Sequence, residues 1–326
     1  MSIGGNDPQR STADNYRVFG REAHGRSPAY ESLSASVADD DLVLGFLSTL
    51  PRPKRQPNLL FAASRYLLGT TPDIDILRQL IQRNETELTQ VMLARRTQTN
   101  EPARCATILP ALARLPEPLA LIEVGASAGL TLLFDRYSYD YDGHLVAGAD
   151  TDAPALRCGV RGPVPLPSRL PAIAWRAGLD LNPLDVTRDD DVRWLSCLIW
   201  PGEGDREERL IAAVAAARRD PPPVYRGDLL TDLPALAAQA PADATLVIFH
   251  SAVLAYVAAE GRERFAQTVH GLGAVWLSNE APGVVPGLPI TEFLEATFVL
   301  GQDGRTPLAL TDGHGAWLHW LDSADG

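Results

Sequence analysis

The chain has 326 residues, which is enough for one large domain or two smaller ones with a sizeable hydrophobic core. Hydrophobic residues make up 45% of the chain and charged residues 21%, the composition of an ordinary soluble globular protein. The formal net charge is -12 and the sequence pI is about 5.0, which argues against a surface that binds phosphate backbones, so we expect no nucleic-acid partner.

Residues 1–115 are expected to form a helical N-terminal region. Residues 1–21 are polar and lack the apolar core of a signal peptide, and no later apolar run reaches the length of a membrane span. This pattern predicts a cytoplasmic protein with no membrane partner. Apolar spacing after Pro57 predicts a buried helix over residues 57–68 that Gly69 ends. Similar patterns predict helices over residues 30–50, 74–97 and 105–115.

The most informative stretch is residues 119–130, an apolar run that ends in an acid and turns through small residues. It predicts a buried strand, a tight turn and a helical segment over residues 130–137, an arrangement in which a ligand can approach bare backbone. Glu123, Gly125 and Gly129 give the pattern acid-x-Gly-x-x-x-Gly, which resembles the first motif of class I S-adenosylmethionine-dependent methyltransferases. The resemblance implies a cofactor site at this turn, with Glu123, Gly125, Ser127 and Gly129 as candidate cofactor-binding residues.

Two other interpretations of the same turn remain open. Ser127 lies in Gly-Ala-Ser-Ala-Gly, which matches the G-x-S-x-G nucleophile elbow of serine hydrolases, although we expect none of the strands that precede the elbow in that fold. A dinucleotide fingerprint needs Gly at the first, third and sixth turn positions, and only Gly125 fits. A phosphate loop needs Gly-Lys, and the only lysine is Lys54. A hydrolase and an NAD(P)-binding enzyme therefore stay as alternatives.

Residues 138–171 are expected to form an inserted hairpin and loop. After them, Gly178-Leu179-Asp180-Leu181-Asn182-Pro183 resembles the end of the second methyltransferase strand, where a carboxylate accepts both ribose hydroxyls of the cofactor. Asp150 is a rival, because it follows Gly129 at about the offset of a dinucleotide acid. The Gly and Pro neighbours favour Asp180.

Strand-like runs alternate with helical patterns from residue 119 onward, which indicates a parallel sheet with crossover helices. Five strands are expected over residues 119–124, 172–181, 224–228, 245–249 and 273–277. A closing pair, 296–300 and 317–320, flanks a turn-rich stretch over residues 301–315. We therefore expect an α/β protein in which residues 116–326 form a Rossmann-like, doubly wound, mostly parallel sheet with an antiparallel C-terminal hairpin.

Further polar residues follow the later strands. Asp228 stands at the end of the third strand, where the methyltransferase resemblance implies a contact with the adenine amino group. His250 and Glu280 follow the fourth and fifth strands, and strand ends in open α/β sheets line the ligand crevice, so both are candidate catalytic residues. Asn100 and Arg104 are candidates for the aminoacyl end of the cofactor, where Arg could pair with its carboxylate. The three separated cysteines form no C-x-x-C pair, so we expect no metal.

Several segments together resemble an uncharacterised bacterial family, domain of unknown function 2332. They are 98–104, 123–129, 137–141, 178–183, 200–201 and 317–320. That resemblance implies a Rossmann-like fold and no particular reaction. The sequence therefore predicts an S-adenosylmethionine-dependent methyltransferase that acts on a small-molecule acceptor, with a non-catalytic nucleoside-binding protein as a further alternative. It carries no signal for an oligomeric state.

Overall fold

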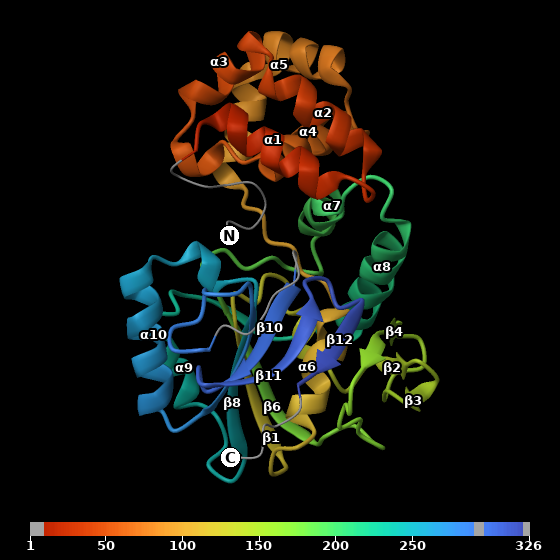
Figure 1. The fold of residues 1–326 in the computed structure, drawn as a ribbon, viewed down its shortest axis with the longest axis vertical. Helices are drawn as coiled ribbons and strands as arrows, with labels where there is room; N and C mark the ends of the chain where they lie inside the picture. Colours follow the sequence, from red (N-terminus) through yellow and green to blue (C-terminus); the bar gives the residue numbers. More distant parts are fainter. Residues whose placement is uncertain (1–9, 290–296, 322–326) are drawn as a thin grey trace. The chain divides into compact units, whose positions relative to one another are not determined.

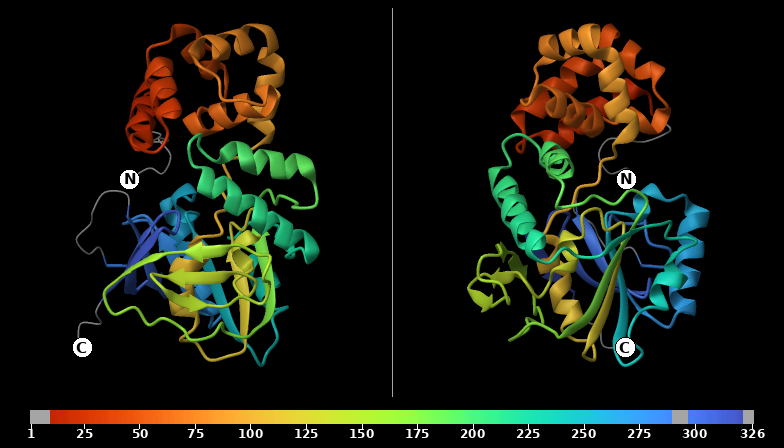
Figure 2. Two further views of the ribbon diagram at one scale, coloured as in Figure 1. Left: turned by 90° about the vertical axis from the view of Figure 1, so that its right-hand side faces the viewer. Right: turned by 180° about the vertical axis from the view of Figure 1, so that it is seen from behind.

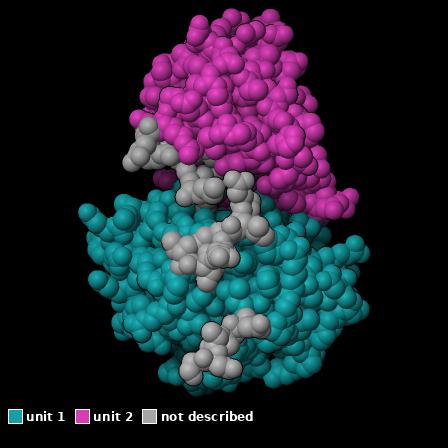
Figure 3. Space-filling model, in the orientation of Figure 1, with its two compact units in different colours: residues 1, 100–187, 209–326 teal, residues 2–99, 188–208 magenta. Residues whose placement is uncertain are grey.

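The computed structural model describes residues 10–289 and 297–321 of the chain. The chain divides into two compact units, and each is built from more than one stretch of sequence (Figure 3). One unit comprises Asn100–Thr187 and Arg209–Gly326, and the other comprises Ser2–Thr99 and Arg188–Glu208. We call them the sheet unit and the helical unit. The helix α8 (Gly204–Arg219) contributes its first residues to the helical unit and the remainder to the sheet unit.

In its described residues the helical unit contains six further α-helices: α1 (Thr12–Ala23), α2 (Pro28–Ala38), α3 (Asp41–Thr49), α4 (Pro57–Leu68), α5 (Ile74–Ala94) and α7 (Asp189–Leu198). The predicted helix over residues 57–68 is confirmed, and Gly69 ends it in the left-handed conformation, with φ of +75°. The single helix predicted over residues 30–50 is wrong. Two helices occupy that range because the Asp40 side chain accepts the Val43 N–H at 2.9 Å and caps a new helix, α3.

Aromatic side chains fill the core of the helical unit. The Phe61 ring contacts the rings of Tyr16, Phe19 and Tyr30 at centroid distances of 5.8, 5.9 and 4.9 Å. Trp200, from the later stretch of the unit, lies 4.8 Å from Phe19. Residues distant in sequence therefore share one core.

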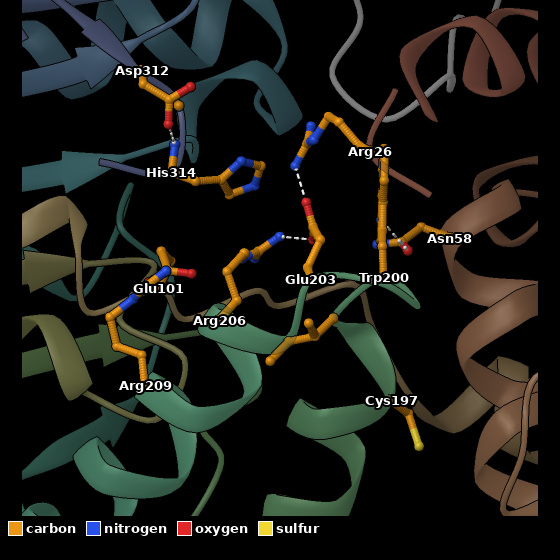
Figure 4. Close-up of polar contacts among 12 residues, drawn as sticks. Arg26, Asn58, Glu101, Cys197, Trp200, Glu203, Arg206, Arg209, Asp312 and His314 are labelled. Carbon is orange, nitrogen blue, oxygen red and sulfur yellow. Dashed lines mark hydrogen bonds and ion pairs between the residues drawn. The ribbon is translucent and has the colours of Figure 1, made fainter. Parts of the chain in front are cut away.

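Polar contacts hold the later stretch of the helical unit in place. The Trp200 indole N–H donates to Asn58 Oδ1 at 3.2 Å (Figure 4). Glu203 forms ion pairs with Arg26 and Arg206, each at 2.5 Å (Figure 4). The segment 188–208 is thus an integral part of this unit.

The sheet unit is a mixed α/β fold around a large, mostly parallel sheet of nine strands, in the order β5-β12-β11-β10-β9-β8-β1-β6-β7 (Figure 1). Its parallel core consists of β1 (Leu119–Val124), β6 (Ile173–Asp180), β7 (Val224–Arg226), β8 (Thr245–Ser251) and β9 (Val275–Glu280). Every residue of β1 is buried, as expected for an apolar run in the centre of a parallel sheet. Helices α6 (Arg104–Leu112) and α10 (Ala259–Gly271) lie on opposite sides of the sheet (Figures 1 and 2).

The C-terminal strands correct one part of the sequence analysis. The predicted strands 296–300 and 317–320 correspond to β10 (Thr297–Gln302) and β12 (Trp317–Trp320), and residue 296 lies outside the described residues. The stretch between them holds another strand, β11 (Thr306–Asp312), which pairs antiparallel with both neighbours. The sheet therefore ends in an antiparallel meander and not in a simple hairpin. Its apolar signal is short, because only three consecutive residues carry it between two turn-rich ends.

The helical segment predicted over residues 130–137 is also wrong. Only a short 3-10 helix, η3 (Leu130–Leu132), follows the turn. The Arg176 side chain donates to the Leu132 carbonyl at 2.9 Å. It also forms a bidentate ion pair with the Asp135 carboxylate, at 2.7 and 2.6 Å. These bonds hold the segment against β6 and use a carbonyl that a continued α-helix would need.

The expected insertion contains the predicted hairpin, formed by β2 (Ser138–Tyr141) and β3 (His144–Val146). A third strand, β4 (Ala155–Arg157), pairs parallel with β2 and completes a small separate sheet. The next strand, β5 (Gly159–Arg161), joins the large sheet beside β12. Among the described residues, no helix is both long and apolar enough to cross a membrane.

Phe61→Ala tests the core of the helical unit. Removal of a fully buried ring that contacts three other rings should lower the free energy of unfolding by about 3–5 kcal/mol in urea denaturation. Leu93→Ala is the control, because Leu93 in the same unit is 46% exposed and its loss should change stability by less than about 0.5 kcal/mol. Equal effects of the two substitutions would contradict this description of the core.

Candidate functional site

Several candidate site residues lie at or near the carboxyl ends of the parallel strands, beside the point where the strand order reverses. β6 and β7 lie on one side of β1, whereas β8 and β9 lie on its other side. In open α/β sheets the loops that leave the strands at such a switch point diverge and leave a crevice for ligands. The two loops here follow Val124 and Ser251, the last residues of β1 and β8.

The loop after β1 is a tight turn with left-handed backbone at three positions. The φ angles are +71° at Gly125, +53° at Ser127 and +72° at Gly129. Glycine adopts this conformation at little cost, whereas Ser127 adopts it only because its surroundings enforce it. The Gly125 N–H donates to the Leu179 carbonyl at 2.8 Å, which ties the turn to β6.

Asp180 ends β6, the neighbour of β1, and the residue is 8% exposed. Oδ2 accepts the Ser127 N–H at 2.8 Å, and Oδ1 accepts the Asn182 N–H at 2.7 Å. The rival residue Asp150 lies between β3 and β4 of the small separate sheet, and its carboxylate pairs with Arg219. The structure thus brings Asp180, and not Asp150, to the turn after β1.

Glu123 is a buried carboxyl group at the end of β1. Thr131 donates a hydrogen bond to Oε1, and within the described residues Oε2 is buried without a hydrogen-bond partner. Burial raises the pKa of Glu123 to about 8; the Thr131 hydroxyl and Arg104 oppose the shift, and Asp180 adds to it. Glu123 is therefore protonated in the folded protein at neutral pH, with one oxygen that still needs a partner.

Asn100, in the segment before α6, and Arg104, the first residue of α6, also contact this region. Asn100 Oδ1 accepts the Leu130 N–H at 2.8 Å, which fixes the residue that follows Gly129. Arg104 donates to the Gly313 and Ser251 carbonyls at 2.9 and 3.1 Å. Asn100 thus lies at the turn, whereas Arg104 joins α6 to the end of β8 and to the loop after β11.

The strand register separates the polar side chains into two layers. Glu123 is paired with Phe249 in β8, and Ser251 is paired with Asn279 in β9, so these side chains share one face of the sheet. This is the face covered by α6. His250 and Glu280 alternate with them and lie on the face covered by α10.

The structure brings His250 and Glu280 into direct contact. The indole N–H of Trp276 donates to His250 Nε2 at 2.9 Å, so Nε2 is the unprotonated nitrogen. Nδ1 must then carry the proton, which it donates to Glu280 Oε1 at 2.7 Å. His250 is fully buried and both ring nitrogens are used, so it can act as a base only after Trp276 releases Nε2.

Glu280 Oε1 also binds backbone. It accepts the N–H groups of Val253 and Leu254 at 2.7 and 3.0 Å, and Oε2 is buried without a hydrogen-bond partner in the described part of the chain. Asp228, the remaining candidate, follows β7 and is half-buried. Its Oδ1 accepts the Leu230 N–H at 2.8 Å.

Val253 is a residue of this site that the sequence analysis missed. A Cβ placed on Gly125 would lie only 2.4 Å from Val253 Cγ2, so the valine fills the space beside the turn. Nothing in the apolar run after His250 singles this residue out. Thr131 was missed too, and its position eight residues after Glu123 becomes informative only once the turn is folded.

The sheet unit thus presents a mixed α/β fold with buried carboxyl groups at a switch point of its sheet. The chain belongs to domain of unknown function 2332, a family described as an uncharacterized protein conserved in bacteria, whose match covers residues 13–320. This confirms the family resemblance seen in the sequence. No curated protein and no solved structure matches the chain.

Glu123→Gln tests the buried carboxyl group through the pH dependence of stability. Because its pKa rises from 4.5 to about 8 on folding, the folded state binds more protons between these values, and wild-type stability should fall as pH rises. From pH 5 to 8 the variant should gain stability relative to wild type in urea unfolding, by up to about 1.4 kcal/mol per pH unit. Glu117→Gln is the control, since the pKa of Glu117 is lowered by its bond with Arg169 and should give no such trend above pH 6. If the difference in unfolding free energy between Glu123→Gln and wild type did not change with pH, the raised pKa of Glu123 would be refuted.

Proposed function

We propose that the sheet unit is Rossmann-like and binds S-adenosylmethionine at the turn after β1, and that the protein transfers its methyl group to a small-molecule acceptor. The observation that carries the proposal is the bond from Ser127 N–H to Asp180 Oδ2, which joins an acidic strand end to a glycine turn beside the switch point. The order β7-β6-β1-β8-β9 supports it, because it reproduces the order 3-2-1-4-5 of the class I methyltransferase sheet.

The residues at the turn fit such a cofactor. Each Asp180 oxygen accepts a backbone N–H at the end of β6, and a carboxylate held there suits the two ribose hydroxyls. Glu123 Oε2 is a buried polar atom without a hydrogen-bond partner in the described residues, and it can hydrogen-bond a polar group of a ligand or a water. Asp228 would accept from the adenine amino group. The bound cofactor supplies an electrophilic methyl group, and the chain's own residues orient the reactants and exclude water.

The acceptor is proposed to be a small molecule because the net charge of -12 does not suit a polyanion. Methyl transfer needs a base only where the acceptor must lose a proton. His250 and Glu280 were the candidates for that role, but they are buried and hydrogen-bonded to each other, which favours a positioning role over that of a base.

A serine hydrolase is the second candidate, favoured by one observation. Ser127 has φ of +53°, a strained conformation typical of the residue at a nucleophile elbow. A hydrolase also needs a histidine that accepts the serine proton. The His250 ring is instead engaged by Glu280 and Trp276 on the other face of the sheet, so it does not serve Ser127.

A thermal-shift comparison tests the cofactor. S-adenosylhomocysteine at a hundred times its dissociation constant should stabilise the protein by about 2.7 kcal/mol and raise its Tm. NAD and NADP at the same concentration should leave the Tm unchanged. A shift with NADP and none with S-adenosylhomocysteine at millimolar concentration would replace the proposed cofactor with a dinucleotide.

Substitutions at the turn separate the two candidate functions. Asp180→Ala should weaken S-adenosylhomocysteine binding by about 1.5–3 kcal/mol, the range for a hydrogen bond to a charged group. Ser127→Ala should bind nearly as wild type, because Asp180 accepts the Ser127 backbone N–H, which the variant keeps. Asp150→Ala is the matched control and should have no effect. Fluorophosphonate labelling of wild type that disappears in Ser127→Ala would establish the hydrolase instead.

A further inference from the structure

The loop after β8, residues 252–257, runs across the switch point, and we call it the strap. Ala252 begins it with φ of +60°, a conformation that side-chain-bearing residues rarely adopt. The Ala252 N–H donates to the Asn279 carbonyl at 3.1 Å. The strap then forms a short 3-10 helix, η4 (Leu254–Tyr256), and Tyr256 is 56% exposed.

Side chains of neighbouring elements hold the strap. Glu280 Oε1, at the end of β9, accepts the Val253 and Leu254 N–H groups at 2.7 and 3.0 Å. Arg262 of α10 donates to the Val257 carbonyl at 2.8 Å and to the Ala255 carbonyl at 3.4 Å. Because these bonds come from single side chains and not from a strand ladder, the loss of one of them can release a local segment and leave the sheet intact.

The strap closes the space that a ligand at the turn would need. A Cβ on Gly125 would lie 2.4 and 2.8 Å from the two methyl carbons of Val253. The valine side chain therefore packs directly against the Gly125 backbone. Gly125 follows β1 and Val253 follows β8, the two strands that flank the switch point. A nucleoside approaching the Gly125 backbone from this side therefore meets Val253 first.

We propose that the strap is a gate over the Gly125 turn, that Glu280 is its latch, and that His250 positions the latch. His250 donates to the same Glu280 oxygen that binds the strap, and Trp276 holds the histidine from its other nitrogen. Glu280 and His250 are thus positioning residues that act on the ligand through Val253. The identity of the ligand rests on the proposed function, whereas the latch itself does not.

Hydrogen exchange of the whole protein without ligand tests the latch. Glu280→Gln replaces a charged acceptor with a neutral one, so the Val253 and Leu254 amides should exchange at least ten-fold faster. The Ile248 and Phe249 amides, in the β8 ladder, should keep their wild-type rates and show that the sheet is intact. Unchanged protection of Val253 and Leu254 overturns the latch. A uniform rise across β8 overturns it as well, since it assigns Glu280 a purely structural role.

Glu117→Gln is the matched control. Glu117 Oε2 accepts the Ala172 N–H at 3.1 Å and pairs with Arg169 at 2.9 Å, so this carboxylate also holds a loop by its backbone. It lies at the other end of the sheet, before β1. The substitution should accelerate exchange at Ala172 and leave the strap amides unchanged.

Val253→Ala tests the gate and keeps the latch. The variant should take up S-adenosylhomocysteine several-fold faster in stopped-flow binding, with the Leu254 amide as protected as in wild type. Glu280→Gln should raise the same association rate. Association rates equal to wild type in both variants, with S-adenosylhomocysteine bound, would overturn the gate. If S-adenosylhomocysteine fails to bind wild type, the proposed function falls, and exchange at Val253 and Leu254 alone decides the latch.

Discussion

The Asp180 carboxylate accepts N–H groups from two separate stretches of chain, Ser127 in the turn after β1 and Asn182 after β6. Its backbone carbonyl accepts the Gly227 N–H at 2.9 Å, just beyond β7. One residue therefore joins the ends of three neighbouring parallel strands. Two hydrogen bonds hold the left-handed backbone at Ser127. Its N–H donates to Asp180, and its carbonyl accepts the Leu184 N–H at 3.0 Å, so the peptide groups before and after the residue are both fixed.

Two buried glutamates show how the edge of the sheet is divided. Glu123 and Glu280 each use Oε1 for protein hydrogen bonds, and in both, within the described residues, Oε2 has no such partner. Strand alternation places them on opposite faces. Glu123 thus belongs to the layer of the glycine turn, whereas Glu280 belongs to the layer that holds the loop after β8. The same residue type thus lies beside the glycine turn on one face and holds a loop on the other.

The parallel core was predictable from sequence because each of its strands carries a strong local signal. β1 is a continuous apolar run, and the Gly125 turn and Asn182-Pro183 end two neighbouring strands with residues typical of turns. β11 was missed because only Leu308, Ala309 and Leu310 carry its signal between two turn-rich ends. The division of the polar edge into two layers could not be read at all, since it depends on the register between β1, β8 and β9, which no local pattern contains.

The helical unit is completed by a segment that lies far along the chain from its first helices. The Phe19 ring contacts the Trp200 ring, and the Tyr66 ring contacts the Trp194 ring. These two contacts can form only after residues 188–208 have been synthesised. During synthesis the ribosome must first make residues 100–187, which takes on the order of 10 s. Over that interval the nascent helices carry apolar rings without their final partners. The speed of translation through residues 100–187 therefore sets how long Phe19 and Tyr66 lack these ring contacts during synthesis.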